Sequence, residues 1–328
     1  MYDHMIKTEN SDSRNEAWKE YREKITNYIL HSIEDMYYRE HLLREKKRRD
    51  GSFSMDKVIA LLGRKPRVAI WGAGYCNDID LSKLARSVEL VLIDREQERV
   101  LQAASRYGLQ EPGCTCVDLG FWDITEEDER LYDRMLQKDE EDAGLAQSLT
   151  NLGTSLRNVH REARMKNVFD VSVVFGLASQ LNVRFAGLMK AYGKNMQEYK
   201  LVEAALQSLN EQAAQSLWEE LQYTTAKGFV LGTELRTLSR EEWEGKEYFC
   251  QERQEEIETL LLQGDYQQCA TQCEIAGSRE FLICVEESIA RKDVRILQQG
   301  CIFWEFLSDK LFEMDLKSLF RPGADYNS

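Results

Sequence analysis

The chain has 328 residues, of which 43% are apolar and 30% charged, and its formal net charge is −14. This composition is typical of a folded protein with one large domain or two smaller ones. The charge argues against binding to nucleic acid or anionic membrane surfaces, and no segment approaches the ~20 apolar residues of a transmembrane helix.

The first predicted element is a long N-terminal helix. Residues 1–13 show no apolar pattern and are expected to be disordered, without a signal peptide. From Arg14 to Arg49, apolar residues recur at three- and four-residue spacing, which predicts one apolar stripe along a helix. A shorter helix is predicted at Met55–Leu62. Residues 14–65 are therefore predicted to form a helical cap, whose tyrosine-rich stripe either packs in the core or lines a substrate cleft.

Strands and helices alternate after Pro66. Apolar runs predict strands at 68–71, 88–93, 114–119, 169–175 and 229–235. Helical segments are predicted between them at 81–86, 97–107, 177–192 and 198–223, with a charged helical insertion at about 123–167. This order predicts a doubly wound, mostly parallel α/β sheet.

The last part of the chain changes character. Helices are predicted at 248–262 and 278–291, followed by strands at 294–307 and 310–320 that the polar turn Ser308-Asp309 joins. Two consecutive strands with a tight turn are antiparallel. We therefore expect a seven-stranded sheet with a C-terminal antiparallel hairpin, all within a domain of residues 66–328.

The most informative stretch is RVAIWGAGYCNDIDLSKLARSVELVLID, residues 67–94. Gly72 and Gly74 permit positive φ and let a ligand approach the backbone closely. The turn leads into a helix whose first N–H groups can meet a carboxylate or phosphate. Asp94 ends the second strand at the edge where open α/β sheets bind ligands, and its two oxygens suit two ribose hydroxyls. Asp118 ends the third strand at the same edge and can accept a hydrogen bond from adenine.

Two adenosine-containing ligands compete for this pattern, a dinucleotide and S-adenosylmethionine. The dinucleotide fingerprint is G-x-G-x-x-G/A, and here Asn77 takes the third glycine position with Asp78 beside it. A carboxylate repels a pyrophosphate but attracts the ammonium group of a methionine moiety. Asn77, Asp78 and Asp80 each have the chemistry to receive that ammonium or to cap the following helix. The residues favour S-adenosylmethionine and leave an NAD(P)-dependent oxidoreductase as an alternative.

The stretch VAIWGAGYCNDIDL…VELVLID resembles the cofactor-binding half of class I S-adenosylmethionine-dependent methyltransferases. It looks most like a bacterial branch with the glycine motif G-x-G-x-C-N-D-x-D-L. Residues 169–181 (FDVSVVFGLASQL) resemble the family's fourth strand and the turn after it, and residues 227–236 (KGFVLGTELR) its fifth strand after a glycine turn. The terminal hairpin resembles its sixth and seventh strands.

The resemblance implies a role for each matching position. The implied contacts are Gly72, Ala73 and Gly74 with the methionine part, Asp94 with the ribose, Asp118 and Leu119 with the adenine, and Gly176 to Gln180, including Ser179, beneath the methyl group. Many family members carry an acid just before the glycine turn, where this chain has Ile70-Trp71. Asn77, Asp78 or Asp80 would take over the ammonium contact.

The residues do not identify a catalytic group. Methyl transfer needs no obligatory catalytic signature, because the donor is already activated. The eight cysteines match no standard zinc spacing and are expected to be reduced thiols of a cytoplasmic protein without a metal. We expect a methyltransferase that converts S-adenosylmethionine to S-adenosylhomocysteine with a small-molecule or peptide acceptor. The alternative is a catalytically degenerate cofactor-binding or interaction protein, with the N-terminal helices as a homodimer surface.

Overall fold

The computed structural model describes residues 18–45, 54–94, 96–110, 113–118, 142–157, 166–183, 185, 196–238, 268–307 and 310–322. Several predicted features lie outside these ranges: the tail 1–13, Leu119, most of the insertion 123–167, the helix 248–262 and the turn 308–309. The side chain of Asp118 also lies outside the description.

The helices and strands follow the predicted order. The elements are α3 (Lys19–Glu45), α4 (Met55–Leu62), β1 (Arg67–Trp71), α5 (Leu81–Ser87), β2 (Glu89–Asp94), α6 (Gln97–Arg106), β3 (Cys114–Asp118), α8 (Asp142–Arg157), β4 (Phe169–Phe175), α10 (Met196–Thr224), β5 (Thr225–Leu238), α13 (Ser278–Ala290), β6 (Arg295–Leu307) and β7 (Lys310–Phe320), with short 3₁₀ turns η2 (Ala178–Gln180) and η3 (Ala270–Gln272). Among these helices, none is both long and apolar enough to cross a membrane.

The seven strands form one sheet in the order β3-β2-β1-β4-β5-β7-β6. Strands β1 to β5 pair in parallel, and β7 runs antiparallel to both β5 and β6. The prediction of a doubly wound sheet with a C-terminal antiparallel hairpin is therefore confirmed. The chain winds outward from β1 to β3 and returns at β4, so the junction of β1 and β4 is the point where open α/β sheets bind ligands.

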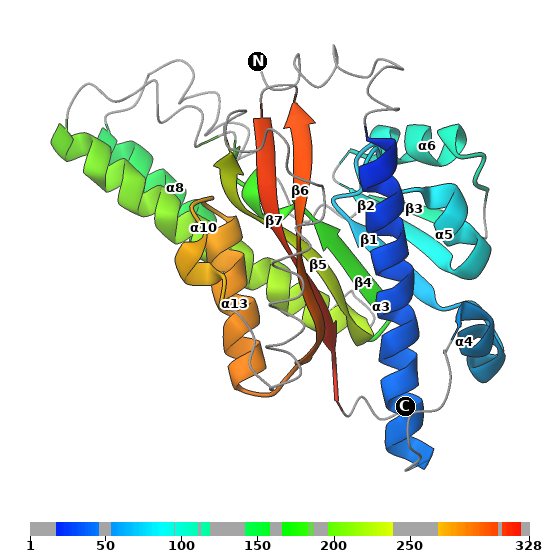
Figure 1. The fold of residues 1–328 in the computed structure, drawn as a ribbon. Helices are drawn as coiled ribbons and strands as arrows, with labels where there is room; N and C mark the ends of the chain where they lie inside the picture. Colours follow the sequence, from blue (N-terminus) through cyan, green and yellow to red (C-terminus); the bar gives the residue numbers. More distant parts are fainter. Residues whose placement is uncertain are drawn as a thin grey trace.

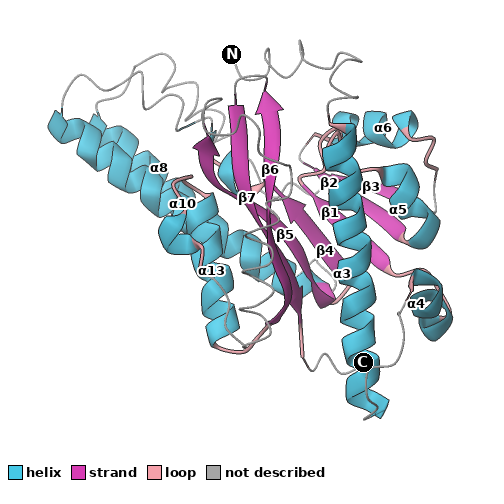
Figure 2. Ribbon diagram, in the orientation of Figure 1, coloured by secondary structure: helices cyan, strands magenta, loops and turns pink. Residues whose placement is uncertain are grey.

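Helices cover both faces of the sheet (Figure 1). Along β1, Val68 and Ile70 join the core that contains α3, α5 and α6, whereas Ala69 and Trp71 join the core that contains α10 and α13. Alternate side chains of a strand point to opposite faces, and both faces are apolar here. The result is a three-layer α/β/α arrangement, which the colouring by secondary structure makes visible (Figure 2).

Helix α3 packs along the sheet with its apolar stripe. Tyr21, Ile25, Ile29, Ile33 and Met36 are all buried in the same core as the strands. The interpretation of this stripe as core packing is confirmed. Because the stripe is covered by the same chain, a homodimer would have to use another surface of the N-terminal helices, and it stays a prediction.

Strand β5 begins earlier than predicted. The sequence suggested a glycine turn at Lys227-Gly228, but Gly228 lies inside β5 and pairs with Val171 and Phe320. A Cβ atom on Gly228 would lie 2.1 Å from the carbonyl oxygen of Leu319. The glycine is therefore needed for close contact between strands, and the predicted turn is wrong.

The helix predicted at 177–192 begins differently. The structure has the 3₁₀ turn η2 first, followed by a turn and by helical backbone at Val183 and Phe185, and residues 184 and 186–195 lie outside the described part of the chain. Gly176 precedes this turn with a φ of +58°, which directs the chain sharply away from β4.

Candidate functional site

The glycine turn adopts the predicted backbone. Gly72 and Gly74 have φ values of +67° and +50°, in the region that glycine occupies without steric cost. A Cβ atom on Gly72 would lie 2.7 Å from Cδ1 of Leu177. This side chain takes the Cβ position of Gly72, while Gly72 itself is exposed, and its contact with a ligand stays a prediction. The side chain of Ala73 is buried, and its N–H donates to the carbonyl of Ile93 at 3.0 Å.

Asp94 is held against the turn. Its Oδ2 accepts a hydrogen bond from the N–H of Gly74 at 2.7 Å, and its Oδ1 accepts one from the N–H of Glu96 at 2.8 Å. Each carboxylate oxygen retains a second lone pair. Asp94 and Asp118 are register partners on β2 and β3, so both lie at the same sheet edge. Among the described residues no further donor is bound to this carboxylate, which leaves two acceptor positions on a fixed carboxylate beside the switch point.

Two of the three polar residues after the turn serve the fold. The Oδ1 of Asn77 accepts a hydrogen bond from Nη1 of Arg106 at 2.6 Å, and the carbonyl of Asn77 accepts one from Nε of Arg22 at 2.8 Å. Asp80 is the N-cap of α5, and its Oδ1 accepts from the N–H of Lys83 at 3.0 Å. These contacts support the capping interpretation for Asp80 and give Asn77 a structural role.

Asp78 is in a different environment. Burial raises the pKa of its carboxyl to about 6, against the lowering effects of its own backbone N–H and of the Arg22 charge. A charged group kept in such surroundings costs folding free energy, and strongly perturbed acids are concentrated at functional sites. Among Asn77, Asp78 and Asp80, the structure therefore makes Asp78 the strongest candidate for contact with a cationic ligand group.

The N-terminus of α5 does not meet the glycine turn. The helix begins at Leu81, after the turn segment Tyr75–Asp80, and the carboxylate of Asp80 occupies its N-terminus. Asp80 accepts from the N–H of Lys83, so one of the helix N–H groups that we expected to face a ligand is used within the fold.

A second set of groups gathers at the end of β4. Ser179 donates its hydroxyl proton to Oε1 of Glu234 at 2.8 Å, and Ser278 donates to Oε2 at 2.9 Å. A Cβ atom on Gly176 would lie 3.0 Å from Glu234 Oε1, so glycine allows the carboxylate to approach. Gln180, the other predicted residue of this turn, is exposed.

Glu234 was missed in the sequence, although a signal existed. It is an acid within the apolar run of β5, in its carboxyl-terminal half, and only 2% of it is exposed. A register irregularity between Glu234 and Arg236 follows immediately. Such bulges redirect side chains, and they are frequent next to functional sites.

Three aromatic side chains pack together beside the same edge, of which Tyr21 and Trp304 are buried and Trp18 is half-buried. The ring of Trp304 stacks on Tyr21 with centroids 6.0 Å apart, and it meets Trp18 edge-on at 5.9 Å. Cζ3 of Trp304 would lie 3.4 Å from a Cβ atom on Gly176. Burial raises the pKa of the Tyr21 hydroxyl well above its usual value, and the charges of Asp78 and Glu234 raise it further. The charges of Asp78 and Glu234 therefore both act on the Tyr21 hydroxyl.

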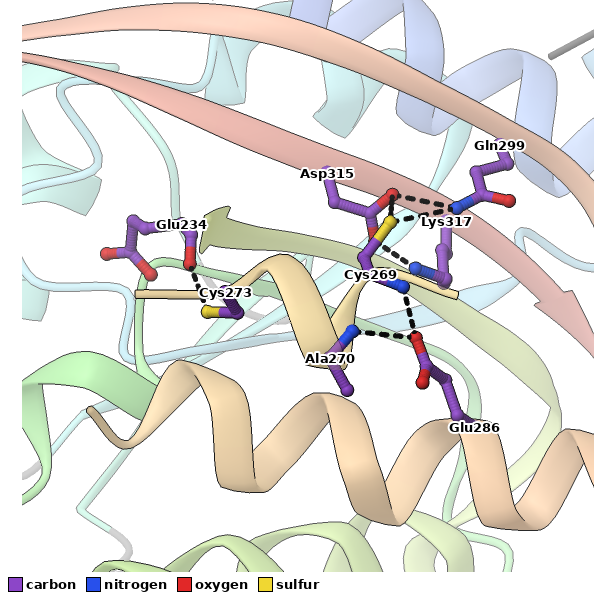
Figure 3. Close-up of polar contacts among 8 residues, drawn as sticks. All are labelled: Glu234, Cys269, Ala270, Cys273, Glu286, Gln299, Asp315 and Lys317. Carbon is purple, nitrogen blue, oxygen red and sulfur yellow. Dashed lines mark hydrogen bonds and ion pairs between the residues drawn. The ribbon is translucent and has the colours of Figure 1, made fainter. Parts of the chain in front are cut away.

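A further polar cluster lies between β6, β7 and the segment before α13 (Figure 3). Glu286 accepts hydrogen bonds from the backbone N–H groups of Cys269 at 2.6 Å and Ala270 at 3.0 Å. Asp315 pairs with the buried Lys317 and accepts from Gln299 Nε2 at 3.0 Å. Burial raises the pKa of the Cys269 thiol far above neutrality, so this thiol stays protonated. The cluster anchors the segment and offers no reactive group.

The described residues form no metal centre at this edge, and the cavity beside β3 is lined by uncharged residues. Within the described part of the chain, no three His, Cys, Asp or Glu side chains converge in a way that would hold a metal ion. A cavity of about 450 Å³ lies between α6 and β3, lined in part by Leu101, Cys114 and Cys116. Its lining includes no acid or base apart from these thiols.

The comparisons with known proteins yield distant structural matches. No protein-family model matches this sequence, and no curated protein sequence matches it. The N-methyltransferase NodS from Bradyrhizobium japonicum, in complex with S-adenosylhomocysteine, is 10% identical, with 81% of this chain and 83% of that chain covered and a TM-score of 0.32. A SAM-dependent methyltransferase from Methanosarcina mazei is 9% identical, with 78% of this chain and 92% of that chain covered and a TM-score of 0.37. The plantazolicin methyltransferase BpumL is 11% identical, with 94% of this chain and 91% of that chain covered and a TM-score of 0.32. At this level of similarity, they define neither a family nor a ligand for this chain.

Proposed function

We propose that this protein is an S-adenosylmethionine-dependent methyltransferase with a small-molecule or peptide acceptor. The observation that carries the proposal is the Asp94 carboxylate, which is fixed by the N–H of Gly74 at 2.7 Å beside the β1–β4 switch point. A carboxylate with spare acceptor positions there suits the two hydroxyls of a ribose.

The chemistry of the turn supports a methionine moiety over a pyrophosphate. A dinucleotide places its pyrophosphate at a helix N-terminus, but Asp80 occupies the N-terminus of α5. The neighbouring Asp78 would add a second negative charge. Both features disfavour the NAD(P)-dependent alternative, and the same acids favour a ligand with an ammonium group.

The residues present fit the proposed ligand. Asp94 would bind the ribose hydroxyls. Asp78 would bind the ammonium group, because Ile70-Trp71 stands where many methyltransferases carry an acid. Asp118 and Leu119 remain proposed for the adenine. The ligand supplies an activated methyl group; the contribution of the chain is to bind it and to orient an acceptor at the end of β4.

The direct test is a binding measurement with three ligands. We expect S-adenosylmethionine and S-adenosylhomocysteine, but not NAD, to raise the melting temperature. Asp94→Ala removes charge-assisted hydrogen bonds worth about 1.5–3 kcal/mol each, so the affinity for S-adenosylhomocysteine in calorimetric titration should fall by at least about tenfold. Asp56→Ala, at an exposed acid of α4, is the control. Stabilisation by NAD alone, or unchanged affinity in Asp94→Ala, would refute the proposal.

One observation keeps a second function open. Ile70-Trp71 stands where many methyltransferases carry an acid, and the indole of Trp71 donates to Ser172 Oγ at 2.9 Å within the core. If S-adenosylhomocysteine binds but no methyl transfer occurs with any acceptor, a degenerate cofactor-binding protein is the better description.

A further inference from the structure

The polar groups at the end of β4 are arranged to accept hydrogen bonds. The single hydroxyl proton of Ser179 is directed to Glu234 Oε1 at 2.8 Å, which is closer than the carbonyl oxygen of Gly176 at 3.4 Å. A hydroxyl that gives its proton to a carboxylate has only lone pairs left for a further partner. Ser179 is half-buried at the edge, so it presents an acceptor there while Glu234 stays behind it.

The fold holds Glu234 in this orientation from three directions. It is placed by β5, and hydroxyls from the turn after β4 and from the start of α13 donate to its two oxygens. A Cβ atom on Gly176 would lie 3.0 Å from the carboxylate, so any larger residue would crowd it. The orientation of the Ser179 hydroxyl is therefore fixed by the surrounding elements and not by solvent.

An aromatic side chain completes this edge. Trp18 is half-buried and meets the buried ring of Trp304, which stacks on the buried Tyr21 and approaches Gly176. The charge of Glu234 contributes to the raised pKa of the Tyr21 hydroxyl, so the field of this carboxylate reaches the aromatic group. Aromatic faces and negative charge both attract cations.

We propose that the methyl acceptor is an amine, recognised by the Ser179 oxygen and the half-buried Trp18, with Glu234 as the residue that positions Ser179. This inference rests on the proposed methyl transfer. In that transfer the bound ammonium first releases a proton to water, which frees the nitrogen lone pair. The lone pair then bonds the methyl carbon, while the sulfur–methyl bond breaks and its electron pair stays on sulfur. The positive charge passes from sulfur to the methylated nitrogen.

The test measures binding to the full chain loaded with S-adenosylhomocysteine. The probes are 2-phenylethylamine, which is cationic at pH 7, and 2-phenylethanol, which has the same skeleton without the charge. We expect the amine to bind at least about tenfold more tightly than the alcohol. In Glu234→Gln the new amide can donate to Ser179 and turn its hydroxyl outward, so this preference should fall by about tenfold.

Controls separate recognition from folding. Glu313→Gln changes another buried acid of the same sheet, one that pairs with Arg236 at 2.7 Å, and should keep the preference for the amine. Trp18→Leu tests the aromatic contribution independently. It should weaken binding of the amine more than binding of the alcohol. Affinity for S-adenosylhomocysteine should stay within about twofold of wild type in all three variants.

The outcomes are distinct. Equal binding of amine and alcohol, no binding of the amine, or an unchanged preference in Glu234→Gln would overturn the inference while S-adenosylhomocysteine still binds. Failure of wild-type protein to bind S-adenosylhomocysteine would instead refute the proposed function, and this inference with it.

Discussion

Replacement of Asp78 by asparagine should stabilise the free protein and lower its affinity for the ligand. Burial raises the pKa of this carboxyl from 3.8 to about 6. The folded state therefore holds the proton more tightly than the unfolded chain. The protonated carboxyl favours folding below about pH 4, and this contribution is lost as the pH rises through about 6.

The magnitude follows from the size of the shift. About two pKa units correspond to about 3 kcal/mol at 1.36 kcal/mol per unit. Because the side chain is half-buried, solvent screening reduces this to about 1–2 kcal/mol. Asp78→Asn should then raise the melting temperature at pH 7.5 by roughly 2–6 °C. The gain should shrink toward zero near pH 4, where the wild-type carboxyl is protonated as well.

Ligand binding should change in the opposite direction. If Asp78 pairs with the ammonium group, Asp78→Asn should lower the affinity for S-adenosylhomocysteine about tenfold or more at pH 7.5. Wild-type affinity should fall as the pH drops below about 6, and the variant should show a flatter profile.

Asp80→Ala is the matched control. It removes the N-cap of α5 and should lower stability by about 1 kcal/mol with little change in affinity. Differential scanning calorimetry and titration calorimetry between pH 4.5 and 8 measure both quantities. A variant at Asp78 that is less stable than wild type at pH 7.5, or that binds S-adenosylhomocysteine equally well, would refute this reasoning.

Two further predictions concern the sheet that carries the site. Gly228→Ala should cost roughly 3 kcal/mol or more in denaturant unfolding, since its Cβ would lie 2.1 Å from the Leu319 carbonyl oxygen; a loss below about 0.5 kcal/mol would contradict this. Lys317→Met leaves Asp315 charged and buried (Figure 3) and should cost roughly 3–5 kcal/mol, whereas adding Asp315→Leu should recover most of it. A double variant no more stable than the single one would be inconsistent with an uncompensated charge.

The local features of the site could be predicted from sequence. The apolar runs indicated the strands, and the two glycines with Asp94 indicated the turn and its acid. These features depend on residues about twenty positions apart in one strand–turn–helix–strand unit. The positive φ at Gly72 and Gly74 and the contact between Gly74 and Asp94 follow from that local pattern.

The other side of the site could not be predicted in this way. Trp18 and Trp304 meet only because the start of α3 lies against β6 in the folded chain. Ser278 reaches Glu234 across 44 positions. Likewise, Leu177 lies where a Cβ atom of residue 72 would be, through a contact between two turns. No periodicity encodes such pairings, because each depends on how separate elements pack.

Helix α3 joins the two halves of this edge. Arg22 donates to the carbonyl of Asn77 in the turn after β1, and Thr26 accepts from the N–H of Asp80. Beside Arg22, Tyr21 donates to the sulfur of Met314 on β7 and stacks on Trp304. The same helix therefore fixes the proposed cofactor turn and the proposed acceptor side. A shift of α3 would move both together, so the two halves are held in register by one rigid element rather than by two independent loops.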